Sequence, residues 1–172
     1  MAIVMDAASS LARHGFRRIL LSNGHGGNEA TLTYTAYRIT KETPAQAVVF
    51  GIAELRKIYL TAEIDKLDIH AGIGETSSML YQQPELVRRG HIQRPVMTLD
   101  PWRERLLAKV RQDPGLLRYV TLKLPAVHEI SSNGCITYGD PARGSPERGK
   151  ELFEAFVAAL AAFIRAWESA TT

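Results

Sequence analysis

Residues 17–28 read Arg17-Arg18-Ile19-Leu20-Leu21-Ser22-Asn23-Gly24-His25-Gly26-Gly27-Asn28. The apolar run in this stretch fits a short buried strand, and the glycines after it are unsuited to regular secondary structure. Apolar residues recur at helical spacing over residues 3–14, residues 29–41 fit a second helix, and another apolar run lies at residues 47–50. The order of helix, strand, glycine loop, helix and strand predicts a three-layer α/β/α sandwich with a mainly parallel sheet.

The segments further along the chain predict more elements of the same kinds. A second loop is expected at residues 69–74, followed by a helix over residues 75–83 that is entered through Thr76 or Ser77. Residues 53–68 are ambiguous, and residues 85–118 carry several turn formers.

The last third of the chain ends in a long amphipathic helix. Polar and apolar residues alternate over residues 119–124, as in a half-buried strand, and a loop is expected at residues 133–144. Ser145-Pro146-Glu147 combines a capping hydroxyl, a proline at the first helical position and an early acid, which predicts a helix start. We find no internal repeat and no linker, so residues 1–172 are expected to form one domain. The apolar face of the final helix comprises Leu152, Phe153, Phe156, Val157, Leu160, Phe163, Ile164 and Trp167.

Composition excludes several classes of protein. The formal net charge is only +3 and the basic residues are scattered, which argues against nucleic-acid binding. Cys135 is the only cysteine, so no disulfide forms within the chain, and a reducing cytoplasm is expected. No stretch is long and apolar enough for a membrane span, and the N-terminal residues do not resemble a signal peptide.

The glycine loop at residues 23–28 admits two interpretations. Ligands of open α/β sheets bind beyond the carboxyl ends of strands, which makes His25 a candidate metal ligand or acid/base. Asn23 and Asn28 are suited to fix such a loop through side-chain hydrogen bonds. The simpler interpretation is a glycine turn with an exposed histidine. A nucleotide-binding fingerprint is excluded, because Glu29 stands where the third glycine would be needed and no Gly-Lys-Ser/Thr follows.

A second group of polar residues lies at the expected loop around residue 70. Asp68, His70 and Glu75 fall within eight residues, beside glycines and a predicted helix start. Carboxylates and imidazoles bind Zn²⁺ or Mn²⁺ and carry protons. In the simpler interpretation, Asp68 caps a turn and Glu75 complements the helix dipole. Two histidine–glycine loops in one α/β chain favour a functional site.

Three segments together resemble the creatininase family of amidohydrolases: Asn-Gly-His-Gly-Gly-Asn at residues 23–28, His-Ala-Gly-Ile-Gly-Glu-Thr-Ser at residues 70–77, and Gly-Cys-Ile-Thr-Tyr-Gly-Asp-Pro at residues 134–141 with Glu-Arg-Gly at residues 147–149. The resemblance implies an α/β/α fold, a homo-oligomer that is commonly hexameric, and a site for two divalent metal ions, with zinc, manganese or iron as candidates. It implies hydrolysis of a small cyclic or linear amide by metal-activated water. Family substrates include creatinine, a formamidopyrimidine nucleotide and a redox-cofactor precursor peptide.

The resemblance also assigns roles to individual residues. His25 matches a metal-binding histidine, His70 the histidine implicated in proton transfer, and Glu75 a glutamate that binds metal or a metal-bound water. Creatininase itself has a metal-binding glutamate at the position of Gly27, which argues against creatinine as the substrate. The remaining matched positions are candidate substrate or loop residues: Asn23, Gly24, Gly26, Gly27, Asn28, Gly72, Thr76 and Ser77.

One part of the family pattern is absent from this sequence. The family normally begins with a strand carrying Glu-x-His-Gly, then His-Leu-Pro and Thr-Asp, which supply three metal ligands. The chain is therefore expected to lack the first strand or strands and to hold an incomplete metal site. Three hypotheses stay open: a hydrolase completed by a partner chain or a missing N-terminal segment, an inactive truncated member, or a non-catalytic binding or scaffolding subunit.

Overall fold

The computed structural model describes residues 1–51, 68–113, 115 and 127–170. The chain divides into two compact units, Met1–Tyr59 with Phe156–Thr172, and Leu60–Ala155. The assignment of one domain stays a prediction. The expected strand at residues 119–124 and most of the ambiguous segment at residues 53–68 lie outside the described residues.

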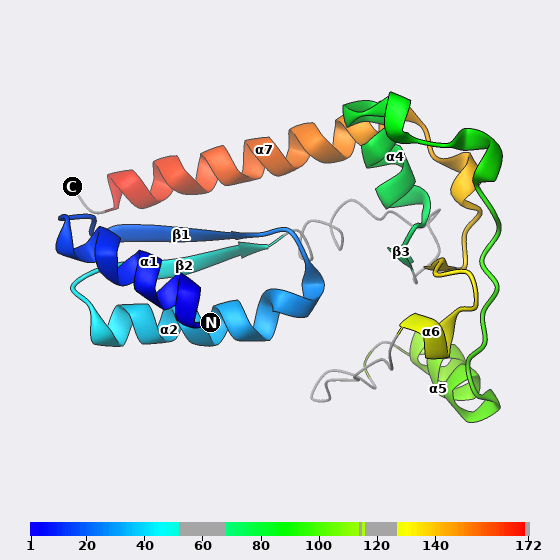
Figure 1. Cartoon of the computed structure of the whole chain (residues 1–172), viewed down its shortest axis with the longest axis horizontal. Helices are drawn as coiled ribbons and strands as arrows, with labels where there is room; N and C mark the ends of the chain where they lie inside the picture. The colour runs from blue at the N-terminus through cyan, green and yellow to red at the C-terminus, as the bar shows by residue number, and fades with distance from the viewer. Residues whose placement is uncertain (52–67, 114, 116–126, 171–172) are drawn as a thin grey trace. The chain divides into compact units, whose positions relative to one another are not determined.

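The first unit contains a parallel pair of strands that are connected by a helix (Figure 1). β1 and β2 pair in register from Arg18↔Gln46 to Asn23↔Gly51. This confirms the order that was predicted for the first fifty residues. The elements are α1 (Ala2–Arg13), β1 (Arg18–Asn23), the 3₁₀ turn η1 (Gly26–Asn28), α2 (Glu29–Glu42), β2 (Gln46–Gly51) and the later part of α7 (Pro146–Ser169).

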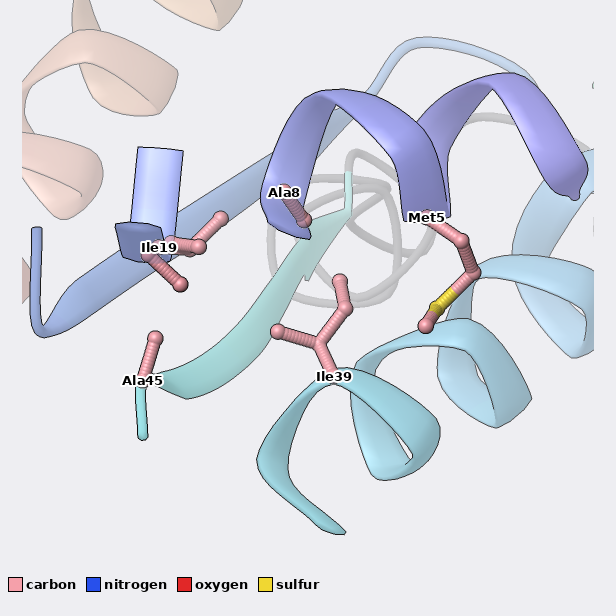
Figure 2. Packing of buried hydrophobic residues seen from close by; sticks show 6 residues of the cluster. Met5, Ala8, Ile19, Ile39 and Ala45 are labelled. Atoms are coloured by element: carbon pink, nitrogen blue, oxygen red, sulfur yellow. The ribbon is translucent and has the colours of Figure 1, made fainter. Parts of the chain in front are cut away.

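Helices cover both faces of this strand pair. Figure 2 shows the core on one face, where α1 and α2 meet the sheet through Met5, Ala8, Ile19, Ile39 and Ala45. Ile39 is fully buried, which contributes about 1.5–3 kcal/mol relative to exposure. Side chains alternate along a strand, so Phe50 lies on the opposite face from Ala47. There the Phe50 ring packs edge-on against Phe156 of α7 with centroids 5.2 Å apart, which completes a three-layer α/β/α arrangement.

A glycine ends α1 in the way that the sequence predicts. Gly15 has φ +94°, a left-handed conformation that other residues adopt only at a cost. Its N–H donates to the carbonyl of Ala12 at 3.1 Å. The N–H of Phe16 donates to the carbonyl of Leu11, also at 3.1 Å. This pair of bonds is the Schellman motif, which satisfies the last carbonyls of the helix and turns the chain toward β1.

The second unit is built around a short antiparallel pair. β3 (Asp68–His70) pairs with β4 (Ile136–Thr137), with an irregularity between Asp68 and His70. Its small core contains Leu99, Ile130 and Ile136. The other elements are α4 (Ile73–Gln82), η2 (Pro84–Leu86), η3 (Arg89–His91), α5 (Pro101–Gln112), α6 (Val127–Ile130), η5 (Pro141–Arg143) and the first residues of α7.

Some predicted boundaries in this unit were wrong. The expected loop at residues 69–74 is shorter, because β3 extends to His70 and α4 begins at Ile73 rather than through Thr76 or Ser77. The reason is a contact within the unit: Asp68 Oδ2 accepts a hydrogen bond from the N–H of Gly74 at 2.9 Å and so satisfies a first-turn donor of α4.

The closing segment departs from the prediction in one respect and agrees in another. The expected loop at residues 133–144 contains β4 and η5. The start of the final helix is confirmed: α7 begins at Pro146, and Ser145 Oγ accepts from the N–H of Arg148 at 3.3 Å. Four residues of its apolar face are exposed, namely Phe153, Val157, Phe163 and Ile164.

Candidate functional site

The first candidate loop leaves the sheet at the carboxyl end of β1. Asn23, the last residue of the strand, is buried, and its Oδ1 accepts from the backbone N–H of His25 at 3.1 Å. This confirms that Asn23 fixes the loop through its side chain. Asn28 occupies the N-cap position of α2 but makes no side-chain capping bond. The side-chain bond that holds the glycine loop therefore comes from Asn23, at the end of β1. His25, two residues after Asn23, is exposed.

The His25 imidazole is folded back onto its own loop. Nδ1 accepts a hydrogen bond from the N–H of Gly27 at 3.2 Å. An imidazole that accepts through Nδ1 carries its proton on Nε2 when it is neutral. A Cβ at position 27 would lie 3.0 Å from both Nδ1 and Cε1 of His25, so this ring position depends on glycine there.

The second candidate loop joins β3 to α4 in a few residues. His70 ends the strand, is partly buried and pairs with Ile136 across β4. Ala71 then adopts a left-handed backbone with φ +51°, and its N–H donates to Glu75 Oε2 at 2.7 Å. Gly72 is buried and precedes the first residue of α4. His70 and Glu75 thus lie on either side of one tight turn.

The simpler roles expected for Asp68 and Glu75 are both realised. Asp68 accepts from the N–H of Gly74, and Glu75 lies in the first turn of α4, where a carboxylate complements the helix dipole. Neither structural role excludes a further role in the functional site, because a carboxylate has two oxygens and several lone pairs. The bonds instead hold the carboxylates at defined positions.

The glycines of the third segment are packed against α4. A Cβ on Gly149 would overlap the carbonyl of Ser77, and one on Gly144 would lie 2.9 Å from Thr76 Cγ2. The N–H of Ser145 donates to Ser77 Oγ at 3.1 Å, and Ser77 is fully buried. Thr76 and Ser77, which were candidate substrate or loop residues, therefore contact the closing segment and help to seat α7 on α4.

Cys135 lies in the third segment, but the sequence assigned it no role in the site. Its thiol is buried and donates to the carbonyl of Ala71 at 3.5 Å. Burial raises the pKa of the Cys135 thiol, and the charges of Asp68 and Glu75 raise the pKa further. The thiol is therefore neutral and serves as a weak donor to the left-handed turn. The signal in the sequence that could have pointed to Cys135 was its position in this closing segment.

The structure brings some of the predicted residues together within a unit. His70, Gly72, Glu75, Thr76 and Ser77 lie on one strand–turn–helix of the second unit, whereas residues 23–28 belong to the first. Among the described residues, no group of three or more His, Cys, Asp or Glu side chains is placed to hold a metal ion. Within either unit taken by itself, the described donors therefore do not supply a two-metal site. No helix in the described part of the chain is long and apolar enough to cross a membrane.

Comparison with known proteins agrees with the motifs. The family model for creatininase, described as creatinine amidohydrolase, matches residues 1–164. A crystal structure from Bacteroides fragilis, of a protein whose assignment as a creatinine amidohydrolase is itself provisional, is 26% identical with a TM-score of 0.72. The match covers 94% of this chain and 58% of that chain, so this chain spans little more than half the length of that relative. No curated protein matches. The chain belongs to the creatininase family.

Proposed function

We propose that this chain carries the His70–Glu75 side of the active site of a metal-dependent amidohydrolase, which hydrolyses a C–N bond of a small cyclic or linear amide. The observation that carries the proposal is the turn that holds the Glu75 carboxylate on the N–H of Ala71, one residue after His70, in a chain of the creatininase family. A histidine close in sequence to a carboxylate that is held at a defined position is suited to move a proton.

His70 is proposed to donate a proton to the leaving nitrogen of the amide. It is partly buried at the end of β3. Glu75 accepts a hydrogen bond from the N–H of Ala71, which orients its carboxylate, and it is proposed to bind a water or a metal ion. Proton transfer of this kind contributes roughly 10²–10⁴-fold to rate.

Metal dependence is part of the proposal, with zinc, manganese or iron as candidates and with His25 and Glu75 as contributing ligands. Because the described side chains of either unit by itself do not form such a site, the remaining ligands are proposed to come from other residues. A longer chain or a separate partner chain would supply these ligands. The 58% coverage of the Bacteroides fragilis protein is compatible with either source.

The substrate and assembly are also proposals. Glycine at position 27 argues against creatinine and for another small amide, since the glutamate of creatininase itself is absent. A homo-oligomer, hexameric as elsewhere in the family, is supported by exposed apolar side chains such as Phe163 and Ile164. The single cysteine fits a cytoplasmic location.

A second candidate function is a non-catalytic binding or scaffolding subunit. The observation that favours it is the His25 ring, whose Nδ1 is bonded to the N–H of Gly27. A ring held in this way does not direct an unprotonated Nε2 outward to a metal. In this alternative the loops keep their shape without supporting hydrolysis.

Metal analysis and kinetics of three proteins test the proposal. The wild-type chain, His25→Ala and His70→Ala are loaded with Zn²⁺ or Mn²⁺ in the presence of the N-terminal segment of a family member. Hydrolysis of a panel of cyclic and linear amides is followed by release of the amine. We expect His70→Ala to lose at least about 100-fold in kcat with its metal retained, and His25→Ala to lose metal. Unchanged metal content and activity in both variants would refute the assignment and favour the scaffolding subunit.

A further inference from the structure

We infer that Asp68 is a positioning residue, which sets the turn carrying His70 and Glu75 by fitting its carboxylate against Gly72 and bonding the N–H of Gly74. The catalytic meaning of this inference rests on the proposed function, but its structural content does not. Asp68 lies two residues before His70 and is buried. The family-derived roles concern His70 and Glu75 and leave Asp68 without one.

The contact with Gly72 explains why position 72 is a glycine. Its φ is −86°, so its backbone conformation is open to any residue. A Cβ there would instead overlap Oδ1 of Asp68 and would lie 3.1 Å from Cβ of Thr137. Glycine is needed for space, and the space is filled by the Asp68 carboxylate. Asp68 and Gly72 therefore form a matched pair across the turn.

The other carboxylate oxygen ties the strand to the helix. Asp68 Oδ2 accepts from the N–H of Gly74 at 2.9 Å, and a Cβ on Gly74 would lie 3.0 Å from the same oxygen. The bond satisfies a donor of the first turn of α4, where an anion is also favoured by the helix dipole. It fixes where α4 begins relative to the end of β3.

The Asp68 bond and the Glu75 bond overlap along the chain. One joins residues 68 and 74, and the other joins Ala71 to Glu75, so Gly72 lies in the segment that both close, whereas His70 lies in the segment that the Asp68 bond closes. Cys135 Sγ adds a weak bond to the carbonyl of Ala71. If the Asp68 bond is lost, the turn keeps the Glu75 bond and the weak thiol contact, and the position of His70 relative to Glu75 is no longer set from the strand side.

Variants of the full chain separate this role from ordinary core packing. Asp68→Ala removes the acceptor, Asp68→Asn keeps both its size and an acceptor oxygen, and Gly72→Ala introduces the overlapping methyl group. Asp68→Ala/Gly72→Ala makes room for that methyl group. Leu80→Ala is the matched control, because Leu80 is buried in the same helix with no part in the turn. The readouts are the melting temperature, the imidazole NMR resonances of His70 and, where amide hydrolysis is detected, kcat and KM.

We expect Asp68→Ala and Gly72→Ala to shift the His70 resonances and to lower kcat by about 100-fold with little change in KM. Asp68→Asn should stay within about 3-fold of wild-type kcat, and Leu80→Ala should lower the melting temperature without moving the His70 resonances. Gly72→Ala alone should lower the melting temperature by about 5–10 °C, and the double variant should lose less than the two single losses combined.

Unchanged His70 resonances in Asp68→Ala, an Asp68→Asn variant as impaired as Asp68→Ala, or additive losses in the double variant would overturn the inference. A wild-type protein that hydrolyses no amide even in the presence of the N-terminal segment of a family member would count against the proposed function alone. The resonances and the melting temperatures would then still decide whether Asp68 positions the turn.

Discussion

The backbone N–H of Gly27 donates a hydrogen bond to Nδ1 of His25, 3.2 Å away, so the candidate metal ligand of the first loop is held by its own neighbour. The bond joins residues two positions apart and is exposed to solvent. It therefore contributes little free energy, and a stronger partner for the imidazole can replace it. Its geometry depends on the missing side chain at position 27, since a Cβ there would lie 3.0 Å from the ring.

Gly27→Glu should therefore raise the affinity of the chain for Zn²⁺ by at least about 10-fold, because the new side chain displaces the imidazole and adds a carboxylate donor. Gly27→Gln is the matched control, with the same bulk and a weaker donor. Competition with a chromophoric chelator measures both affinities. Equal affinities in the two variants would show that the carboxylate does not reach the ion that His25 binds.

Ala71→Gly should leave the free energy of unfolding unchanged or raise it by up to about 1 kcal/mol, because alanine is strained at φ +51° and glycine is not. The gain is limited by the greater entropy of glycine in the unfolded chain. Ala158→Gly, at an exposed helical position of α7, should instead lose about 0.5–1 kcal/mol. Urea denaturation of both variants checks the contrast, and a similar loss in both would mean that Ala71 is not strained.

Gly149→Ala should lower the free energy of unfolding by about 1–3 kcal/mol, because the added methyl group meets the carbonyl of Ser77 rather than a flexible side chain. Gly90→Ala is the control, since a Cβ on Gly90 meets no atom within 4 Å. We expect it to change stability by less than about 0.5 kcal/mol. Equal effects in urea denaturation would argue against close packing of α7 on α4.

Alkylation of Cys135 by iodoacetamide near pH 8 should be far slower in the folded chain than in urea. The thiol is buried, and its pKa is raised first by burial and then by Asp68 and Glu75. Mass spectrometry over time measures both rates. Fast labelling of the folded chain would place the thiol on the surface.

The same raised pKa makes stability fall with alkali. The unfolded thiol ionises first, near its ordinary value of about 8.5, so stability that is fully present below that pH is lost as the pH rises toward the folded-state pKa. The decrease in stability above about pH 8.5 should therefore be smaller in Cys135→Ala than in the wild type. Parallel decreases in the two proteins would contradict this assignment.

Patterns within one element were sufficient to predict much of the fold. α1, β1, α2 and β2 followed from the spacing of apolar residues, and the start of α7 followed from Ser145 and Pro146, because each signal acts within a few residues. The start of α4 was missed because it depends on the Asp68 carboxylate, which bonds the first helical turn from the preceding strand. Local propensity carries no information about such a contact.

The candidate site was predictable in its residues but not in its geometry. The motifs named His70 and Glu75, yet the left-handed backbone of Ala71 falls on a residue that normally avoids it. The thiol of Cys135 reaches that turn from a distant part of the sequence. Contacts of this kind are set by tertiary packing, and a single sequence does not reveal them.

The ring contact between Phe50 and Phe156 has a consequence for how the protein is made. The two residues are about 100 positions apart in the chain, and closure of so long a loop is an entropic cost that slows folding. During synthesis, α1, β1, α2 and β2 leave the ribosome well before the later part of α7 exists to cover the second face of their sheet. In that interval the Phe50 face is open to water and to other nascent chains, so a chaperone that shields it until α7 arrives would raise the yield of folded protein.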